Sequence, residues 1–264
     1  NDLISEAQNL EQHGIKELSL IAQDLTAYGD DLTNTDTLNH LLEELLVSTS
    51  IPWIRLLYLF PSGINDQLIE IIKNNERIVP YLDMPFQHVS DSVLKRMNRH
   101  YTRRDLYGLI EQLRKHMPEI SLRTTFLLGF PGETEKDIVE LEKFIQDVQF
   151  DHLGVFPYAN EDGCPSQYFK EQCEQEVKDE RVDRILSIQS EISQNKIARF
   201  VGRTEQVLVE GVSKETDLLL EEEVDEIVDD MINKLNWEGP VFRISAATNQ
   251  GITELSQKIM NHLE

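Results

Sequence analysis

The sequence has few cysteines, and their spacing limits what they can do. Cys164 and Cys173 are the two cysteines among 264 residues, with Pro165 between them. This spacing suits neither a close pair of metal ligands nor a disulfide framework. We therefore expect two reduced thiols and no metal site built from them.

Long apolar runs and excess basic charge are missing as well. No apolar run approaches the length that spans a bilayer, and no secretory signal is visible at the amino end. The formal net charge of −23 argues against a broad nucleic-acid-binding surface, although a local basic patch is compatible with it. The apolar content of 40% is ordinary for a soluble protein. We therefore expect a cytoplasmic protein without a membrane partner.

One short apolar segment followed by a glycine turn organises the rest of the chain. Residues 122–128 form an apolar run of strand length that breaks at Gly129 and again at Gly132. A helical pattern begins at Thr134, which can cap the helix together with Asp137. In α/β folds such turns lie at the carboxyl ends of strands, where ligands bind. A tight loop that needs glycine for its dihedral angles explains the same residues equally well.

Apolar runs of strand length alternate with amphipathic helical patterns over most of the chain. The expected strands are 17–22, 53–60, 79–85, 122–128 and 153–158. The expected helices are 2–13, one capped by Asp36, 66–74, one capped by Asp91 that runs through Met97, 102–116, one from Thr134, and 174–199 with Val177, Ile185, Ile188 and Ile192 as its packing face. This alternation predicts a parallel sheet covered by helices. Because no Gly-x-Gly-x-x-Gly fingerprint occurs, a barrel or partial barrel is favoured over a flat doubly wound sheet.

Polar side chains follow several of the expected strands directly. They are Gln23, Asp24, Gln87, His88 and Glu133. Because parallel strands place their carboxyl ends at one rim of a barrel, we expect these side chains to share that rim. Each residue type is also common as a satisfied structural polar group, so a ligand site and a structural role are both open.

Five segments of the chain resemble the radical SAM methylthiotransferases. They are Ile21 to Thr26, Trp53 to Tyr58, Pro85 to Asp91, Leu94 to Arg99 and Arg123 to Glu135. The set is similar to the RimO type, which adds a methylthio group to an aspartate of a small-subunit ribosomal protein. The resemblance covers about residues 1–220 and implies an α/β fold. Residues 1–198 would form a radical SAM partial barrel, and 199–220 would begin a truncated TRAM β element whose first strand is 206–210.

The resemblance also implies cofactors, a partner and site residues. The cofactors would be S-adenosylmethionine and two [4Fe–4S] clusters, and the partner would be a small-subunit ribosomal protein. By resemblance, Gln23, Gln87, His88, Arg123 and Glu133 would line the S-adenosylmethionine and substrate side. Arg123 is the best candidate to bind an anionic group, because its planar fork suits a carboxylate. An ion pair with a neighbouring helix is the alternative role for Arg123, and no catalytic residue is assigned.

The sequence departs from the family at the cluster ligands. The family holds its catalytic cluster with a Cys-x-x-x-Cys-x-x-Cys loop just before the helix at 2–13, and no such loop occurs in this sequence. Cys164 and Cys173 do not have the spacing to replace it. We therefore expect an incomplete, N-terminally truncated barrel that lacks its first strand, and a chain that is inactive alone.

The strongly acidic residues 221–264 have a different character. Their pattern predicts an αβα tail that resembles the carboxyl end of an Obg-type GTP-binding domain, through Asn236 to Val241 and Ile244 to Ala247. By that resemblance, Ser245 and Ala246 would approach a guanine base. The phosphate-binding Gly-x-x-x-x-Gly-Lys-[Ser/Thr] loop is absent. The alternatives to a methylthiotransferase are therefore a GTP-binding module acting through this tail and a non-catalytic fusion of two fragments.

Overall fold

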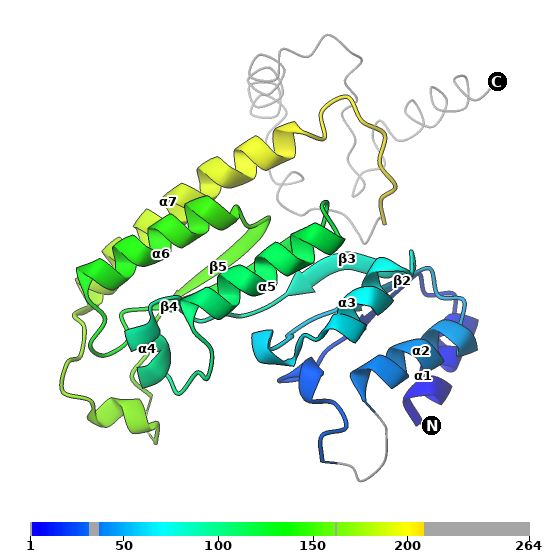
Figure 1. Ribbon diagram of the computed structural model, residues 1–264, viewed down its shortest axis with the longest axis horizontal. Coiled ribbons are helices and arrows are strands. Elements are labelled where there is room, and N and C mark those ends of the chain that lie inside the picture. Colours follow the sequence, from blue (N-terminus) through cyan, green and yellow to red (C-terminus); the bar gives the residue numbers. More distant parts are fainter. Residues whose placement is uncertain (1, 32–36, 162, 209–264) are drawn as a thin grey trace, which may run out of the picture. The chain divides into compact units, whose positions relative to one another are not determined.

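The structure is a computed structural model of the chain, and it describes residues 2–31, 37–161 and 163–208 (Figure 1). The chain divides into two compact units, residues 1–204 and 205–264, and every element below belongs to the first. Residues 206–208 of the predicted TRAM strand have no regular secondary structure. The rest of that strand, the predicted αβα tail, and Ser245 and Ala246 lie outside the described residues.

A parallel sheet in sequence order forms the centre of the first unit. Its strands are β1 (Glu17–Leu20), β2 (Trp53–Leu56), β3 (Ile78–Asp83), β4 (Ser121–Leu128) and β5 (His152–Pro157). They hydrogen-bond in the order β1-β2-β3-β4-β5, and each neighbouring pair is parallel. This confirms the prediction of an α/β fold whose strands follow one another in chain order.

Helices separate the strands and lie over the sheet. They are α1 (Asp2–Gln12), α2 (Leu38–Ser48), α3 (Asp66–Lys73), α4 (Asp91–Arg96), α5 (Arg103–His116), α6 (Glu135–Val148) and α7 (Gln175–Ala198). Short 3-10 turns occur at Leu25–Ala27, Pro61–Gly63 and Pro165–Tyr168. Helices α3, α5 and α6 cover one face of the sheet (Figure 1), and α7 packs against α6 and β5. None of the helices in the described ranges has the length and apolar character needed to span a membrane.

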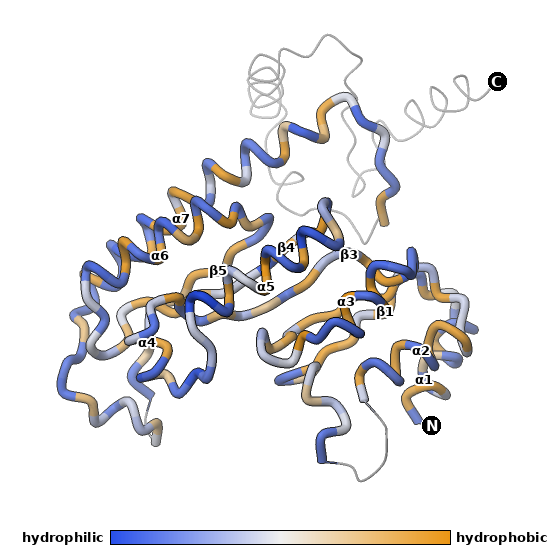
Figure 2. Tube along the Cα trace, viewed as in Figure 1, coloured by the Kyte–Doolittle hydropathy of each residue, from blue (hydrophilic) through white to orange (hydrophobic). Residues whose placement is uncertain are grey.

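Strand β4 shows why the core lies between the sheet and the helices. Its side chains alternate, so that Leu122, Thr124, Phe126 and Leu128 are buried while the intervening residues are partly exposed. Phe126 packs edge to face on Phe150, with ring centroids 6.2 Å apart. Figure 2 shows hydrophobic residues along the strands and alternating hydrophobic and hydrophilic positions on the helices. Burial of a leucine or phenylalanine side chain such as these contributes about 1.5–3 kcal/mol to the free energy of folding.

Several element boundaries differ from the predictions for local reasons. Helix α2 is capped by Thr37, whose side chain accepts from the backbone N–H of His40, rather than by Asp36, which lies outside the described residues. The N-cap of α4 is Ser90, so Asp91 is the first helical residue. Strand β2 ends four residues earlier than predicted because Tyr58 has a φ of +58° and turns the chain.

The long helix α7 is held by polar as well as apolar contacts. Ile185 and Ile192 are buried as predicted, but Val177 is exposed, which corrects the predicted packing face. Lys178 and Gln189 are buried and donate to the backbone carbonyls of Tyr158 and Phe150, each at 2.9 Å.

Candidate functional site

The turn after β4 requires glycine at two positions. Gly129 and Gly132 have φ angles of +76° and +82°. A Cβ at Gly129 would lie 2.3 Å from Cγ of Lys178, and one at Gly132 would lie 1.7 Å from Nη1 of Arg96. The conformation and close packing of this turn are therefore sufficient to explain its glycines, as one of the two sequence interpretations proposed.

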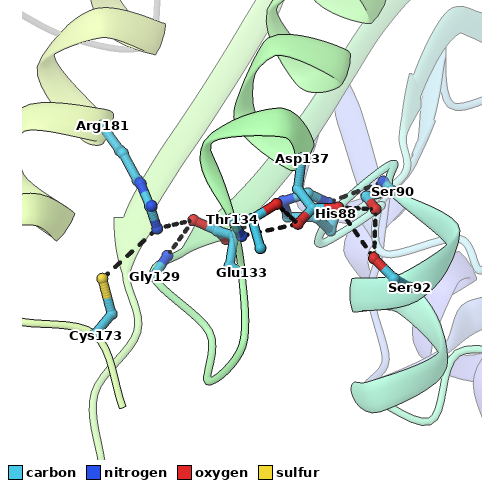
Figure 3. A network of polar contacts seen from close by, with 9 residues as sticks. All are labelled: His88, Ser90, Ser92, Gly129, Glu133, Thr134, Asp137, Cys173 and Arg181. Carbon is cyan, nitrogen blue, oxygen red and sulfur yellow. Dashed lines mark hydrogen bonds and ion pairs between the residues drawn. The ribbon is translucent and has the colours of Figure 1, made fainter. Parts of the chain in front are cut away.

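The side chain of Glu133 folds back under the turn and is completely buried (Figure 3). Its Oε1 accepts from the backbone N–H of Gly129 at 2.9 Å and from Nη1 of Arg181 at 2.7 Å. Arg181 comes from α7 and also donates to Sγ of Cys173 at 3.6 Å. This carboxylate therefore joins the β4 turn to α7.

His88 lies on the other side of Glu133 and is fully buried too. The two atoms Nε2 of His88 and Oε2 of Glu133 are 3.3 Å apart, without hydrogen-bond geometry. The backbone N–H of Ser90 donates to Nδ1 of His88 at 2.9 Å. In the neutral ring Nδ1 is therefore the acceptor, and Nε2 carries the proton next to the carboxylate.

A second buried carboxylate joins the starts of α4 and α6 (Figure 3). Asp137 accepts from the backbone N–H and Oγ1 of Thr134, at 2.8 and 2.6 Å, which confirms the predicted capping box. The hydroxyls of Ser90 and Ser92 also donate to it. Burial opposes ionisation of Asp137, but these hydrogen bonds outweigh burial and lower its pKa to about 2.

Arg123 pairs with a strand neighbour rather than with a helix. Its Nη1 donates to Oδ2 of Asp83 at 2.8 Å, and the two residues are Cα partners on β4 and β3. The Asp83 side chain is 1% exposed and that of Arg123 is 35% exposed. Burial raises the pKa of Asp83, against the opposing effect of Arg123. The pair corrects the sequence alternative of an ion pair with a helix.

Further polar groups lie on the same side of the strands as Arg123. Arg55 on β2 binds Glu17 on β1 through Nε and Nη2, at 2.6 and 3.0 Å. The Arg55 guanidinium lies 4.9 Å from the ring centroid of Tyr81 on β3. The Tyr81 ring lies 6.4 Å from that of His152, which is the Cα partner of Arg123 on β5. All five strands thus contribute a polar or aromatic residue to the face that we call the open face, defined by Glu17, Arg55, Tyr81, Asp83, Arg123 and His152.

The remaining predicted rim residues occupy different environments. Gln23 is exposed after β1, whereas Asp24 accepts from the backbone N–H of Thr26 at 2.9 Å and caps a 3-10 turn. Gln87 is half-buried with a φ of +66° and forms a bridge to Phe126 beside β4. The structure brings His88 and Glu133 together and places Arg123 on the open face. That the five named residues line a cofactor site stays a prediction.

Two further observations concern metals and grooves. Among residues 2–31, 37–161 and 163–208, no group of three or more His, Cys, Asp or Glu residues is arranged to hold a metal ion. A groove of about 570 Å³ lies on the helix side, between α3 and α5, and is lined in part by Glu70, Glu111 and His116.

Comparison with known proteins identifies the family. Residues 1–145 match the radical SAM superfamily. The chain belongs to this superfamily. The parallel sheet is therefore that of a radical SAM partial barrel, as the sequence predicted.

This radical SAM chain has close curated relatives. It is 54% identical over 220 residues to the ribosomal protein uS12 methylthiotransferase RimO of Desulfotalea psychrophila, covering 83% of this chain and 50% of that protein. It is 45% identical over 218 residues to the protein of the same name from Geobacter sulfurreducens, covering 83% and 49%. The chain therefore spans about half the length of the curated relatives that it matches.

Solved structures show a more distant likeness to the radical SAM chain. An archaeal Elp3 from Methanocaldococcus infernus aligns with a TM-score of 0.48 at 13% identity, over 70% of this chain and 48% of that one. Methylornithine synthase aligns with a TM-score of 0.45 at 14% identity, over 90% and 72%.

Proposed function

We propose that this chain is the barrel part of a methylthiotransferase that adds a methylthio group to an aspartate of ribosomal protein uS12. The observation that supports this best is the 54% identity, over 83% of the chain, to a protein named for that activity. The chain spans half of that relative, and we propose that the complete activity also requires the parts that the relative has outside the matched residues. The open face and the adjacent turns are the region that would receive the cofactor and the substrate.

A ligand that carries a carboxylate, as both S-adenosylmethionine and the substrate aspartate do, fits the open face. Asp83 has a buried Oδ1 without a hydrogen-bond partner among the described residues, directly beside the partly exposed Arg123. Arg123, Gln87 and Gln23 would contact the cofactor or the substrate. His88 and Glu133 would hold the β4 turn and the segment after β3 in place beneath it. When bound beside a reduced iron–sulfur cluster, which would provide the electron, S-adenosylmethionine would supply the radical that abstracts a hydrogen atom from the substrate.

Iron–sulfur clusters do not fit the residues of this chain. Such clusters need several thiolates, whereas Cys164 is exposed and Cys173 is half-buried beside Arg181. We propose that the cysteines that bind the two [4Fe–4S] clusters lie outside these 264 residues. The isolated polypeptide would then bind no cluster and cleave no S-adenosylmethionine.

A chimera tests the proposed function. Residues 1–204 of this chain would replace the matching segment of the Desulfotalea psychrophila enzyme, which supplies the remaining parts. After anaerobic reconstitution, we expect uS12 to gain the mass of one methylthio group in place of a hydrogen, at an aspartate. Mass spectrometry of uS12 peptides measures this directly.

Two controls accompany the chimera. The unmodified Desulfotalea psychrophila enzyme shows that reconstitution works, and the 264-residue polypeptide alone should give neither iron nor product. A folded, cluster-loaded chimera that leaves uS12 unmodified would contradict the proposed function. Stoichiometric iron and S-adenosylmethionine cleavage by the isolated polypeptide would contradict the assignment of the cluster ligands to other parts.

A further inference from the structure

On the open face, the guanidinium of Arg123 forms an ion pair with a buried carboxylate and is partly exposed to solvent. Asp83 is buried at the end of β3, and its Oδ2 accepts from Nη1 of Arg123 at 2.8 Å. The Arg123 side chain keeps 35% of its surface exposed. Among the described residues Asp83 is its single ion-pair partner. A guanidinium carries several further N–H donors in a planar fork, and this fork matches a carboxylate in a bidentate arrangement.

The sheet itself fixes the direction of this group. Arg123 lies in the middle of a ladder in which Asp83 is its Cα partner on one side and His152 on the other. The alternation of β4 buries Leu122 and Thr124 against the helices, so Arg123 must lie on the opposite face. Ion pairing to the buried Asp83 restricts its rotamers before any ligand arrives. Such preorganisation lowers the entropic cost of binding an anion.

The surroundings of Arg123 suit a carboxylate that has no ammonium group attached nearby. The carboxylates on the open face are Asp83, which is 1% exposed, and Glu17, which is 13% exposed and bound to Arg55. Each of them already has a guanidinium partner, since Asp83 pairs with Arg123 and Glu17 with Arg55, so an incoming ammonium group would have to compete with an existing ion pair. The side chain of an aspartate within a protein has a carboxylate and no ammonium group. The balance of charge on this face therefore favours the substrate over the cofactor.

We propose that Arg123, positioned by Asp83, binds the side-chain carboxylate of the substrate aspartate and so determines the choice of an acidic side chain. This inference rests on the proposed function and deepens it. In aspartate the carbon next to the side-chain carboxylate is the CH2 group. When Arg123 binds both oxygens of the carboxylate, the CH2 carbon is oriented toward the rest of the open face. A reaction that abstracts a hydrogen atom from that carbon requires such positioning.

The variant Arg123→Lys in the chimera keeps the positive charge at this position and removes the planar guanidinium. Lysine can keep the ion pair with Asp83, so the fold is retained, but it cannot bind a carboxylate in the bidentate manner. We expect the Kd for a uS12 peptide, measured by fluorescence anisotropy without turnover, to rise by about 10- to 100-fold. The Kd for S-adenosylmethionine should change by less than about twofold. Arg104→Lys, an exposed position on α5, is the matched control and should leave both values unchanged.

A second variant tests selectivity, which a merely structural role would not affect. The unsubstituted chimera should bind the aspartate peptide at least about 10-fold more tightly than the same peptide with asparagine. Arg123→Gln should abolish this preference. A rise in the Kd for S-adenosylmethionine, or an unchanged preference for aspartate, would overturn the inference. Because these are binding measurements, a chimera that binds uS12 selectively but does not modify it would count against the proposed function alone.

Discussion

Arg181→Met should be the most destabilising single change at the β4 turn, costing about 3–5 kcal/mol of the free energy of unfolding. The Arg181 side chain is 9% exposed and that of Glu133 is fully buried, with Nη1 and Oε1 2.7 Å apart. Removing the guanidinium leaves a buried carboxylate with one hydrogen bond among the described residues, from the backbone N–H of Gly129, while Nε2 of His88 lies 3.3 Å away without hydrogen-bond geometry. Urea unfolding of the full chain, followed by circular dichroism, measures the loss.

The same helix provides a matched control. Arg184 lies one turn further along α7 and pairs with Glu135 and Glu142 at 2.7 Å each, but its side chain is 33% exposed. Arg184→Met should therefore cost less than about 1 kcal/mol. The double variant Arg181→Met with Glu133→Gln should regain part of the loss, because no buried charge is left unpaired. Equal losses for Arg181→Met and Arg184→Met would show that burial of this pair is unimportant.

Gly129→Ala should have the second largest effect, about 3 kcal/mol. An L-residue at a φ of +76° costs about 1–2 kcal/mol. In addition, the new Cβ would lie 2.3 Å from Cγ of Lys178, a buried side chain that donates to the carbonyl of Tyr158. Because Lys178 cannot move without losing that hydrogen bond, the turn or α7 must shift. Thermal and urea unfolding of the variant measure the cost.

Gly14→Ala isolates the conformational part of this cost. Gly14 has nearly the same φ, +78°, but a Cβ there would meet nothing within 4 Å. We expect a loss of about 1 kcal/mol at Gly14, compared with about 3 kcal/mol at Gly129. Similar losses at the two glycines would mean that the contact with Lys178 contributes little.

The sequence predicted the strands well because their signals are local. Apolar runs such as 122–128 need no knowledge of the rest of the chain, and the capping box of Thr134 and Asp137 is contained in four residues. The end of β2 could not be predicted, because a tyrosine rarely adopts a φ such as the +58° of Tyr58, and no local pattern signals it. Caps one residue away from the predicted position, at Thr37 and Ser90, reflect the same limit of local patterns.

The candidate site was harder to predict because its partners are distant in the sequence. Glu133 was identified from its place after a strand, but its ion pair with Arg181 joins residues 48 positions apart. Arg123 was identified from the sequence, but its partner Asp83, which lies 40 positions earlier in the chain, was missed. A charged residue at the end of an otherwise apolar strand was the available signal for Asp83. Its register opposite Arg123 becomes visible only when β3 and β4 are aligned.

Hydrogen exchange of the reconstituted chimera tests the central claim, which is that the open face and its rim receive the cofactor and the substrate. Exchange would be compared with and without S-adenosylmethionine and a uS12 peptide. We expect ligand-dependent protection in the segments after β3 and β4, residues 84–90 and 129–134, and no change in the α3 and α5 residues that line the outer groove, such as Glu70 and Glu111. Protection confined to that groove, or absent from both segments under saturating ligands, would contradict the account.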